Sequence, residues 1–307
     1  MNRKCLLTLR GMEKCRLPVV VVVVALLQSA CVSVSIQRDE IERYLLWQQP
    51  EKALTAIENH KVESRNRSQY LLDKAMLLRM QGRFEASNAA FENAKALIEK
   101  LDAISLAEQA AALSINDSLR SYLPPPFERV LIHCFSAINY LQLQQYDEAR
   151  VEILQMDELL KQEDEIRLPF GRYLSGLVFE FNQEPDNAMI AYRKAYQAYQ
   201  SDNSVIPLML QEDLLRLSDY LGLSEEHKKF AETFALQDWP RQQQVSQQAR
   251  AIAFVFNGLI PRKHSLEINV QSPADGQLHR ISTPFYEHRA VRVYNAELSS
   301  EAISASS

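Results

Sequence analysis

The stretch GRFEASNAAFENA, residues 82–94, carries the pattern on which the fold prediction depends. A chain-breaking glycine opens it, and Ser87, Phe91 and Ala94 follow at spacings of four and three residues. Side chains at these spacings lie along one face of an α-helix. The small side chain lets a neighbouring helix approach, and the large one fills the gap beyond it. The stretch therefore predicts a turn and then a helix that packs closely against another helix.

The same pattern recurs along the chain. Its small-residue position is occupied in turn by Ala53, Ser87, Ala149 and Ala188. The first interval is 34 residues, the second is lengthened by an insertion around 101–123, and the third is 39. A less regular fifth unit, with Gly222 and a helix at Glu225–Ala235, places the same position another 39 residues further on. These offsets resemble the tetratricopeptide repeat (TPR), a helix pair of about 34 residues. They predict a mainly α fold, a TPR-like helical-repeat solenoid. The alternative, a plain antiparallel bundle, needs no common spacing.

The first helix of each predicted pair carries matching close-packing residues. These are Ala75 with Leu78, Ala137 with Tyr140, and Gly176 with Phe179. Stacked pairs leave a concave face lined by first helices, where such solenoids usually bind. By repeat position we expect that face to include Arg79, Tyr173, Glu180 and Phe181, and Arg, Tyr and Phe are enriched in interface cores. We predict these four as partner-binding residues, and ordinary packing or solvated surface is the alternative.

Residues 1–30 have the composition of an export signal. Five basic residues precede an apolar run at 17–27, and small residues follow. Eleven residues of helix rise roughly 16 Å, about half of a hydrocarbon core of roughly 30 Å. The segment therefore predicts a cleaved signal peptide instead of a permanent transmembrane helix. Met12 offers a second, shorter start.

The end of this segment resembles the lipobox of bacterial lipoproteins. Ser29, Ala30 and Cys31 fit it, whereas Gln28 stands where leucine is usual. The resemblance implies that Cys31 carries diacylglycerol and fatty acid such as palmitate. Val32, in place of aspartate, implies sorting to the outer membrane with the protein facing the periplasm. Without lipidation, the same signal would release a soluble periplasmic protein.

Charge and cysteine content narrow the function classes. Subtracting the leader's net charge of +4 from −5 leaves the remaining chain near −9, which disfavours nucleic acid. The 47% hydrophobic content supports a packed core. Cys5 and Cys15 leave with the signal, so Cys134 is the one thiol besides Cys31. It lies in a helical apolar pattern, and we expect a buried core residue instead of a nucleophile.

From about Ala251 the residue pattern changes from one typical of helices to one typical of strands. A β-prone apolar run at Ala251–Phe256 comes first, and apolar residues then alternate with polar ones over 266–270, the period of a half-buried strand. Further strands are expected at Leu278–Thr283 and Ala290–Tyr294. The predicted organisation is therefore a signal peptide at 1–30, a TPR-like domain at 31–245, a β-rich segment at 246–296 and a disordered tail at 297–307.

Two longer stretches carry a family resemblance. LPPPFERVLIHCFSAINYL, residues 123–141, and NGLIPRK, residues 257–263, resemble the L-x-P-P-F-E-x-V-L-x-H and N-G-L-x-P-x-K signature of a little-characterised group of bacterial lipoproteins with TPR-like helices. The resemblance implies an envelope role, beside lipoproteins that regulate peptidoglycan synthesis or envelope assembly, and brings no catalytic residues. Members of the group continue further, so we expect an incomplete β-rich part here.

The sequence contains none of the common catalytic or nucleotide-binding motifs. G-x-G-x-x-G, Walker A, G-x-S-x-G and H-E-x-x-H are all absent. We therefore expect no enzyme, no cofactor, no metal and no small-molecule substrate. The leading hypothesis is a membrane-anchored lipoprotein that acts as a protein–protein interaction scaffold and binds another envelope protein. The alternatives are a peptidoglycan- or glycan-binding or cell-wall-modifying accessory protein, and a structural assembly subunit.

Overall fold

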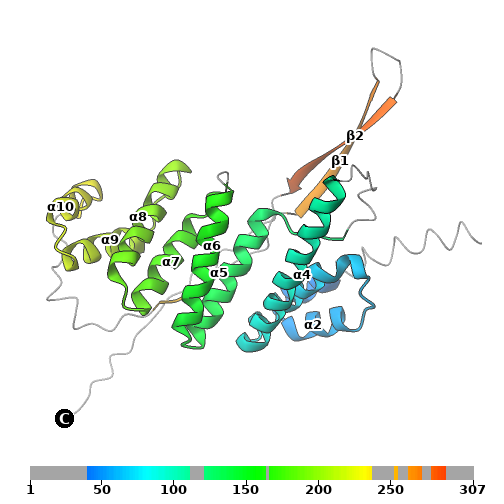
Figure 1. Cartoon of the computed structure of the whole chain (residues 1–307), viewed down its shortest axis with the longest axis horizontal. Helices are drawn as coiled ribbons and strands as arrows, with labels where there is room; N and C mark the ends of the chain where they lie inside the picture. The colour runs from blue at the N-terminus through cyan, green and yellow to red at the C-terminus, as the bar shows by residue number, and fades with distance from the viewer. Residues whose placement is uncertain are drawn as a thin grey trace, which may run out of the picture. The chain divides into compact units, whose positions relative to one another are not determined.

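The computed structural model describes residues 40–110, 121–163, 166–236, 252–254, 262–271 and 278–287 (Figure 1). The chain divides into two units, 1–245 and 246–307, which are described separately. The predicted signal peptide, Cys31, the strand at Ala290–Tyr294 and the tail at 297–307 lie outside the described residues. Among the helices that are described, none is both long and apolar enough to cross a membrane.

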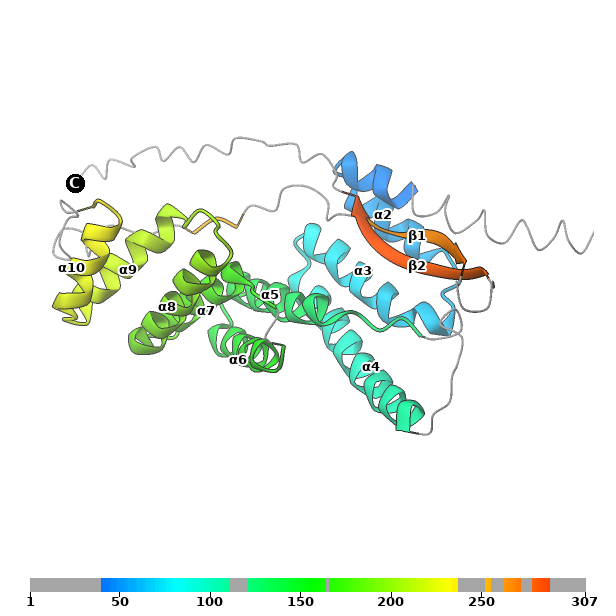
Figure 2. The same ribbon diagram turned by 90° about the horizontal axis from the view of Figure 1, so that it is seen from above.

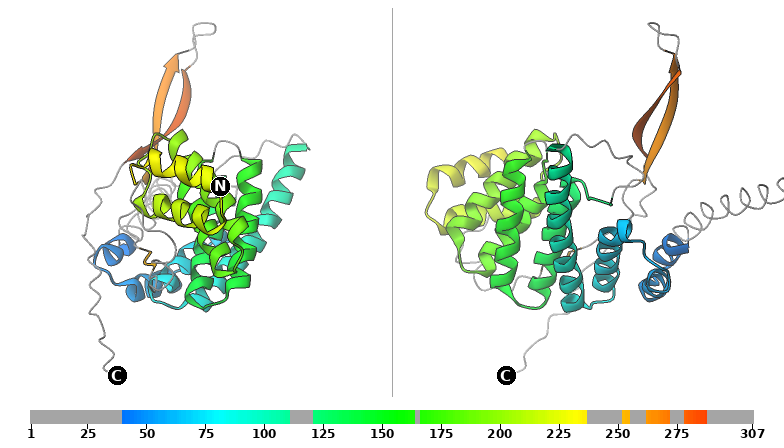
Figure 3. Two further views of the ribbon diagram at one scale, coloured as in Figure 1. Left: turned by 90° about the vertical axis from the view of Figure 1, so that its left-hand side faces the viewer. Right: turned by 45° about the vertical axis from the view of Figure 1, so that its right-hand side comes forward.

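The first unit is built from helices that pack mainly on their neighbours in sequence, as Figures 2 and 3 show. After a short helical segment at 40–46, its helices are α2 (Pro50–Glu58), α3 (Arg67–Met80), α4 (Phe84–Ala110), α5 (Pro126–Gln142), α6 (Tyr146–Gln162), α7 (Pro169–Phe181), α8 (Pro185–Ser201), α9 (Leu208–Tyr220) and α10 (Ser224–Thr233). They form successive pairs. We call the first member of each pair helix A and the second helix B, so that α3 is a helix A and α4 a helix B.

A single kind of turn joins helix A to helix B in every described pair. The residue in left-handed backbone conformation is, in order, Gln48, Gly82, Gln144, Gln183 and Gly222. In the second pair, Gly82 N–H donates to Arg79 O at 2.9 Å and Arg83 N–H to Leu78 O at 3.0 Å. This pair of hydrogen bonds is the Schellman motif that ends a helix. The same two bonds recur at the other four turns.

The turns reproduce the predicted intervals. From Gln48 to Gly82 is 34 residues, and the last two intervals, Gln144 to Gln183 and Gln183 to Gly222, are 39 each. An antiparallel bundle without repeats has no reason to keep one turn geometry at these spacings. The prediction of a mainly α, TPR-like helical-repeat fold is therefore confirmed.

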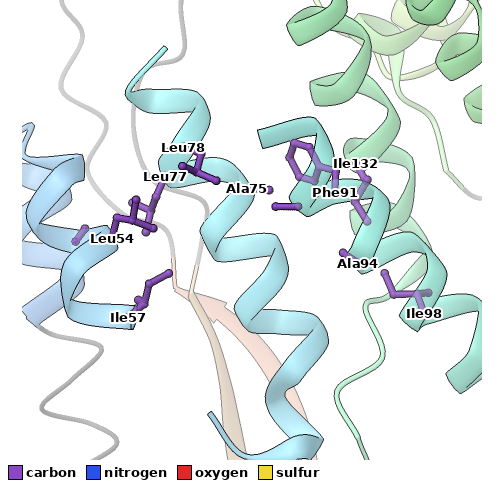
Figure 4. Close-up of a cluster of buried hydrophobic side chains, with 11 residues drawn as sticks. Leu54, Ile57, Ala75, Leu77, Leu78, Phe91, Ala94, Ile98 and Ile132 are labelled. Carbon is purple, nitrogen blue, oxygen red and sulfur yellow. The ribbon is translucent and has the colours of Figure 1, made fainter. Parts of the chain in front are cut away.

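The small residues of the pattern allow the close helix packing that was expected. Ala53, Ser87, Ala149 and Ala188 are all buried. Figure 4 shows the core at the start of the unit, where residues of α3 lie between those of α2 and those of α4. Phe91 belongs to this core, and burying a side chain of this size contributes about 2–3 kcal/mol.

The insertion between the second and third pairs lengthens a helix B. Helix α4 spans 27 residues, against 17 for α6. Arg129 of α5 holds the extension through two bonds to Asp102, from Nη1 at 2.6 Å and from Nη2 at 3.0 Å. Helix α5 begins at Pro126, where a proline costs no hydrogen bond because the first N–H groups of a helix have no partner within it.

The second unit contains an antiparallel hairpin of β1 (Arg262–Gln271) and β2 (Leu278–Glu287), in which Ile268 pairs with Ile281. Strand β1 contains the alternating apolar residues of 266–270, and β2 contains the segment at Leu278–Thr283. The prediction of a strand at Ala251–Phe256 is wrong for its described residues, 252–254, which have no regular structure. Apolar β-prone composition alone did not decide the backbone there.

Candidate protein-binding surfaces

The four predicted partner-binding residues lie on helices α3 and α7. Arg79 and Glu180 are the next-to-last residues of these two helices, so they occupy the same repeat position. Phe181 is the last residue of α7, and Tyr173 lies about two turns before it. The structure brings Tyr173 and Glu180 into one hydrogen-bonded network and places Arg79 in another.

Arg79 links three helices of neighbouring repeats. Its Nη1 donates to Asn139 Oδ1 at 2.5 Å, and its guanidinium lies 5.6 Å from the centre of the Phe135 ring. Asn139 in turn donates to Ser87 Oγ at 2.9 Å and to Asn88 Oδ1 at 2.8 Å. Burial lowers the pKa of Arg79 to about 10, so the side chain keeps its charge at pH 7. Arg79 therefore joins α3 to α5, and a role in binding a partner stays a prediction.

Tyr173 and Glu180 belong to a buried polar network with α8 and α9. The Tyr173 hydroxyl donates to Asp213 Oδ2 at 2.8 Å. Arg216 donates through Nη2 to Glu180 Oε1 at 2.6 Å and to Asp213 Oδ1 at 3.0 Å. The Tyr192 hydroxyl donates to Glu180 Oε2 at 2.5 Å, and burial first, then the two carboxylates, raise the pKa of Tyr192 well above its usual value.

This network limits what Tyr173 can offer a partner. Its side chain is only 8% exposed, and its hydroxyl is already bonded within the protein. The sequence placed Tyr173 at a binding-face position, but the size of the ring lets it reach across to α9. Glu180 is half-buried and bonds to the next repeat. Partner binding by either residue stays a prediction.

Exposed apolar residues recur at the last position of helix A. In order, that position holds Leu46, Met80, Gln142, Phe181 and Tyr220. The four apolar ones, which we call the apolar row, are 58, 51, 42 and 56% exposed. The Phe181 ring stacks on Tyr146 of the preceding repeat, with centroids 5.2 Å apart. Sequence reasoning found only Phe181, although the position two residues before each turn residue would have found the others.

Two grooves lie between successive helices B, each with a helix A as its floor. The α3 groove, between α2 and α4, has a volume of about 400 Å³, and the α7 groove, between α6 and α8, about 170 Å³. Most of their lining residues correspond by one constant offset along the chain: Leu71 with Arg172, Lys74 with Ser175, Leu78 with Phe179, Ala86 with Asn187, Ala89 with Ile190, Ala90 with Ala191, and Asn93 with Lys194. The grooves are therefore the same feature in two repeats. Sequence reasoning missed both, since it considered only the helix A face.

The repeat between these two fills the corresponding position with its own side chains. Counted from the turn residues, His133 stands where Leu71 does, and Glu152 stands where Ala90 does. Glu152 is 3% exposed, with Oε2 at 2.7 Å from His133 Nδ1 and Oε1 at 2.8 Å from Lys95 Nζ. Burial acts to raise the pKa of Glu152, but hydrogen bonds from His133 and Lys95 outweigh it and lower the pKa.

The remaining candidate for chemistry is Cys134, and the prediction of a buried core residue is confirmed. Its side chain is buried, and its thiol lies 3.2 Å from the sulfur of Met156. Burial raises the pKa of Cys134 to about 12, which keeps the thiol protonated at neutral pH. Within the described ranges, no group of three or more His, Cys, Asp and Glu side chains is arranged to hold a metal ion.

No protein-family model matches the sequence, and no curated protein matches it either. Several solved structures are similar to part of the chain. MamA from Desulfovibrio magneticus RS-1, from residue 41 onward, is 15% identical and covers 70% of this chain and 97% of its own, with a TM-score of 0.45. A putative kinesin light chain from Podospora anserina with nearly identical TPR-like repeats is 14% identical and covers 71% and 98%, with a TM-score of 0.44. RapI in its apo form is 10% identical and covers 65% and 68%, with a TM-score of 0.48.

Proposed function

We propose that this chain is a membrane-anchored lipoprotein of the bacterial cell envelope whose TPR-like repeats bind another envelope protein. The apolar row carries the proposal. A single exposed apolar residue is ordinary, but here large apolar side chains recur at one position in four of the five described helix pairs. Exposed apolar surface is characteristic of protein–protein contacts, and a partner that lies along the repeats would cover several residues of the row. No catalytic step is part of the proposal.

Residues 1–32 support the proposed lipid anchor at Cys31. The basic leader, the apolar run at 17–27 and the small residues before Cys31 support export and lipidation, and Val32 supports sorting to the outer membrane with the protein facing the periplasm. More than one acyl chain on the cysteine would hold the protein stably, because a single chain binds membranes only marginally. Cells fed a palmitate analogue should label the wild type and not Cys31→Ala. An unlabelled wild type would contradict the anchor.

The partner is sought by photo-crosslinking in intact cells, with a crosslinking amino acid placed beside the apolar row. We expect one defined crosslinked species, reduced several-fold by Met80→Ser combined with Tyr220→Ser. Gln142→Ser is the matched control, because it changes the same repeat position where the side chain is already polar. Equal crosslinking in the double variant and the control would contradict a role for the row.

A separate measurement tests whether the protein binds or cleaves peptidoglycan. The purified protein is incubated with purified peptidoglycan, and co-sedimentation and release of fragments are scored. We expect neither. Saturable sedimentation with the glycan, or released fragments, would replace the proposal with a peptidoglycan-binding or cell-wall-modifying role.

A further inference from the structure

The α3 groove has an apolar floor and, on the side of α4, a wall of small side chains. Tyr70, Leu71 and Leu78 of α3 supply apolar surface along its floor. Ala89 and Ala90 of α4 carry only methyl groups, so the helix B wall stands low and leaves the volume of about 400 Å³ between α2 and α4. The groove can therefore take an aliphatic side chain against Tyr70 without displacing a side chain of the protein.

The same groove concentrates positive charge in an acidic protein. Arg67, Lys74 and Arg83 line it together with one carboxylate, Glu58, although the whole chain has a net charge of −5. Lys74 Nζ donates to Glu58 Oε1 at 2.6 Å, and this bond raises the pKa of Lys74. The Arg67 guanidinium lies 5.1 Å from the centre of the Tyr70 ring. Within the described residues, neither Arg67 nor Arg83 is within 4.0 Å of a carboxylate oxygen.

The other repeats show which group such a groove accepts. In the middle repeat the carboxylate of Glu152 lies against two basic side chains, Lys95 and His133, at the position where α4 has Ala90. In the smaller α7 groove, Asp157 supplies a carboxylate from the other wall and accepts bonds from Lys194 at 3.2 Å and from Arg172 at 3.4 Å. In both repeats the carboxylate comes from this chain. The α3 groove has two further arginines and no second carboxylate among its lining residues.

We propose that the α3 groove binds an acidic segment of the partner protein. One glutamate or aspartate would lie against Arg67 and another against Arg83, at the two ends of α3, with aliphatic neighbours on Tyr70 and Leu78 between them. This inference rests on the proposed function and specifies the partner's chemistry. A guanidinium binds a carboxylate through two parallel N–H···O bonds, which suits arginine better than lysine for this role. A protein segment fits better than an anionic lipid surface, because the precedent is a carboxylate side chain on a packed helix.

The binding chemistry is tested with synthetic peptides on the full chain purified from membranes. The probe is a short fluorescein-labelled peptide in which glutamate alternates with leucine and serine. One comparison peptide has every glutamate changed to glutamine, and another has every leucine changed to serine. We expect saturable binding of the first peptide, weakened about tenfold or more by the glutamine change and less by the serine change. Equal affinities for the three peptides, or no saturable binding of the first, would overturn the proposal.

Variants of the protein locate the site. Arg67→Ala with Arg83→Ala should weaken binding of the glutamate peptide about tenfold, whereas Lys52→Ala with Lys100→Ala should not. The control pair removes two exposed cations from α2 and α4, outside the groove lining. Ala89→Glu should also block the peptide, because it places a carboxylate on the groove wall, and its position is exposed, so that the helix tolerates it. Full binding by either groove variant would overturn the assignment.

Two further outcomes keep this proposal distinct from the proposed function. If the arginine variant recovers its crosslinked partner from cells as well as the wild type does, the groove assignment fails and the scaffold role stands. If the wild type recovers no partner, the scaffold role fails whatever the peptides show. In a last experiment, binding of the wild type and of the arginine variant to vesicles of anionic phosphatidylglycerol is measured. Binding that depends on Arg67 and Arg83 for vesicles and not for peptides would overturn the proposal in favour of a lipid.

Discussion

Gly176 of α7 lies directly against the ring of Tyr192 of α8. A Cβ atom on Gly176 would stand 2.2 Å from Cε1 of that ring, well inside any non-bonded contact. Tyr192 is 0% exposed, and its hydroxyl is bonded to Glu180, so the ring has little freedom to move aside. The absence of a side chain at 176 therefore sets how closely helix A and helix B approach in this repeat.

Gly176→Ala should lower the free energy of unfolding by about 1–2 kcal/mol. Overpacking costs roughly 1–3 kcal/mol, and the better helix propensity of alanine returns up to about 1 kcal/mol. Urea unfolding followed by circular dichroism measures the change. Gly171→Ala is the control, since its Cβ would meet the flexible Leu168 side chain at 2.7 Å and the loss should be smaller. An unchanged midpoint for Gly176→Ala would contradict the packing argument.

A rescue variant sharpens this test. The corresponding pair in the second repeat is Ala75 with Phe91, both buried. Gly176→Ala combined with Tyr192→Phe reproduces that pair and frees the ring from its bond to Glu180. We expect the double variant to recover part of the loss. A strictly additive loss would indicate that the ring is held by packing alone.

Glu152 should make the protein sensitive to acid. Its pKa is lowered in the folded state by His133 and Lys95, so its contribution is present above the ordinary glutamate pKa of 4.5 and is lost as pH falls below it. Glu152→Gln should therefore cost about 2–3 kcal/mol at pH 7 and little at low pH. Unfolding curves between pH 7 and pH 3 measure this. Glu99→Gln, on the exposed side of α4, serves as control, and parallel pH profiles for the two variants would contradict the role of Glu152.

The repeat architecture was predictable from sequence because it depends on local rules. Ser87 and Ala149 mark the close-packing position, and a left-handed turn residue precedes each by five residues, whether it is Gly82 or Gln144. Glycine marks that turn readily, but glutamine does not, so the spacing and not the residue type carried the prediction. The β tail was less predictable, because a strand depends on the strand that it pairs with, and residues 252–254 did not form one.

The candidate site was only partly predictable, because contacts between repeats depend on side-chain reach. Repeat position placed Tyr173 on the binding face, yet its hydroxyl bonds to Asp213 of the next repeat. The grooves arise because Ala90 and Ala191 stand where Glu152 stands in the middle repeat. No single unit shows this difference. It becomes visible only when three helices are assembled and the lining residues are compared.

The Cys134 thiol should be unreactive in the native protein. Its pKa of about 12 leaves almost no thiolate, the reactive form, at pH 8. Its side chain is also buried, so a thiol reagent cannot reach the sulfur. In a chain whose other cysteines are replaced by alanine, iodoacetamide should label Cys134 only in denaturant. Labelling in buffer at a rate near that of free cysteine would contradict this packing.

Tyr173→Phe separates a structural role of this residue from a binding role. The substitution removes the hydroxyl that bonds to Asp213, whose side chain is buried, and should lower the free energy of unfolding by about 1–2 kcal/mol. Tyr196→Phe is the matched control, because its hydroxyl accepts an exposed bond from Gln200, and its loss should stay below about 0.5 kcal/mol. Since the ring of Tyr173 is almost fully covered, partner crosslinking at a temperature where both variants are folded should equal the wild type. If a folded Tyr173→Phe protein loses its partner, Tyr173 is instead a partner-binding residue, and its hydroxyl is the group that the partner contacts.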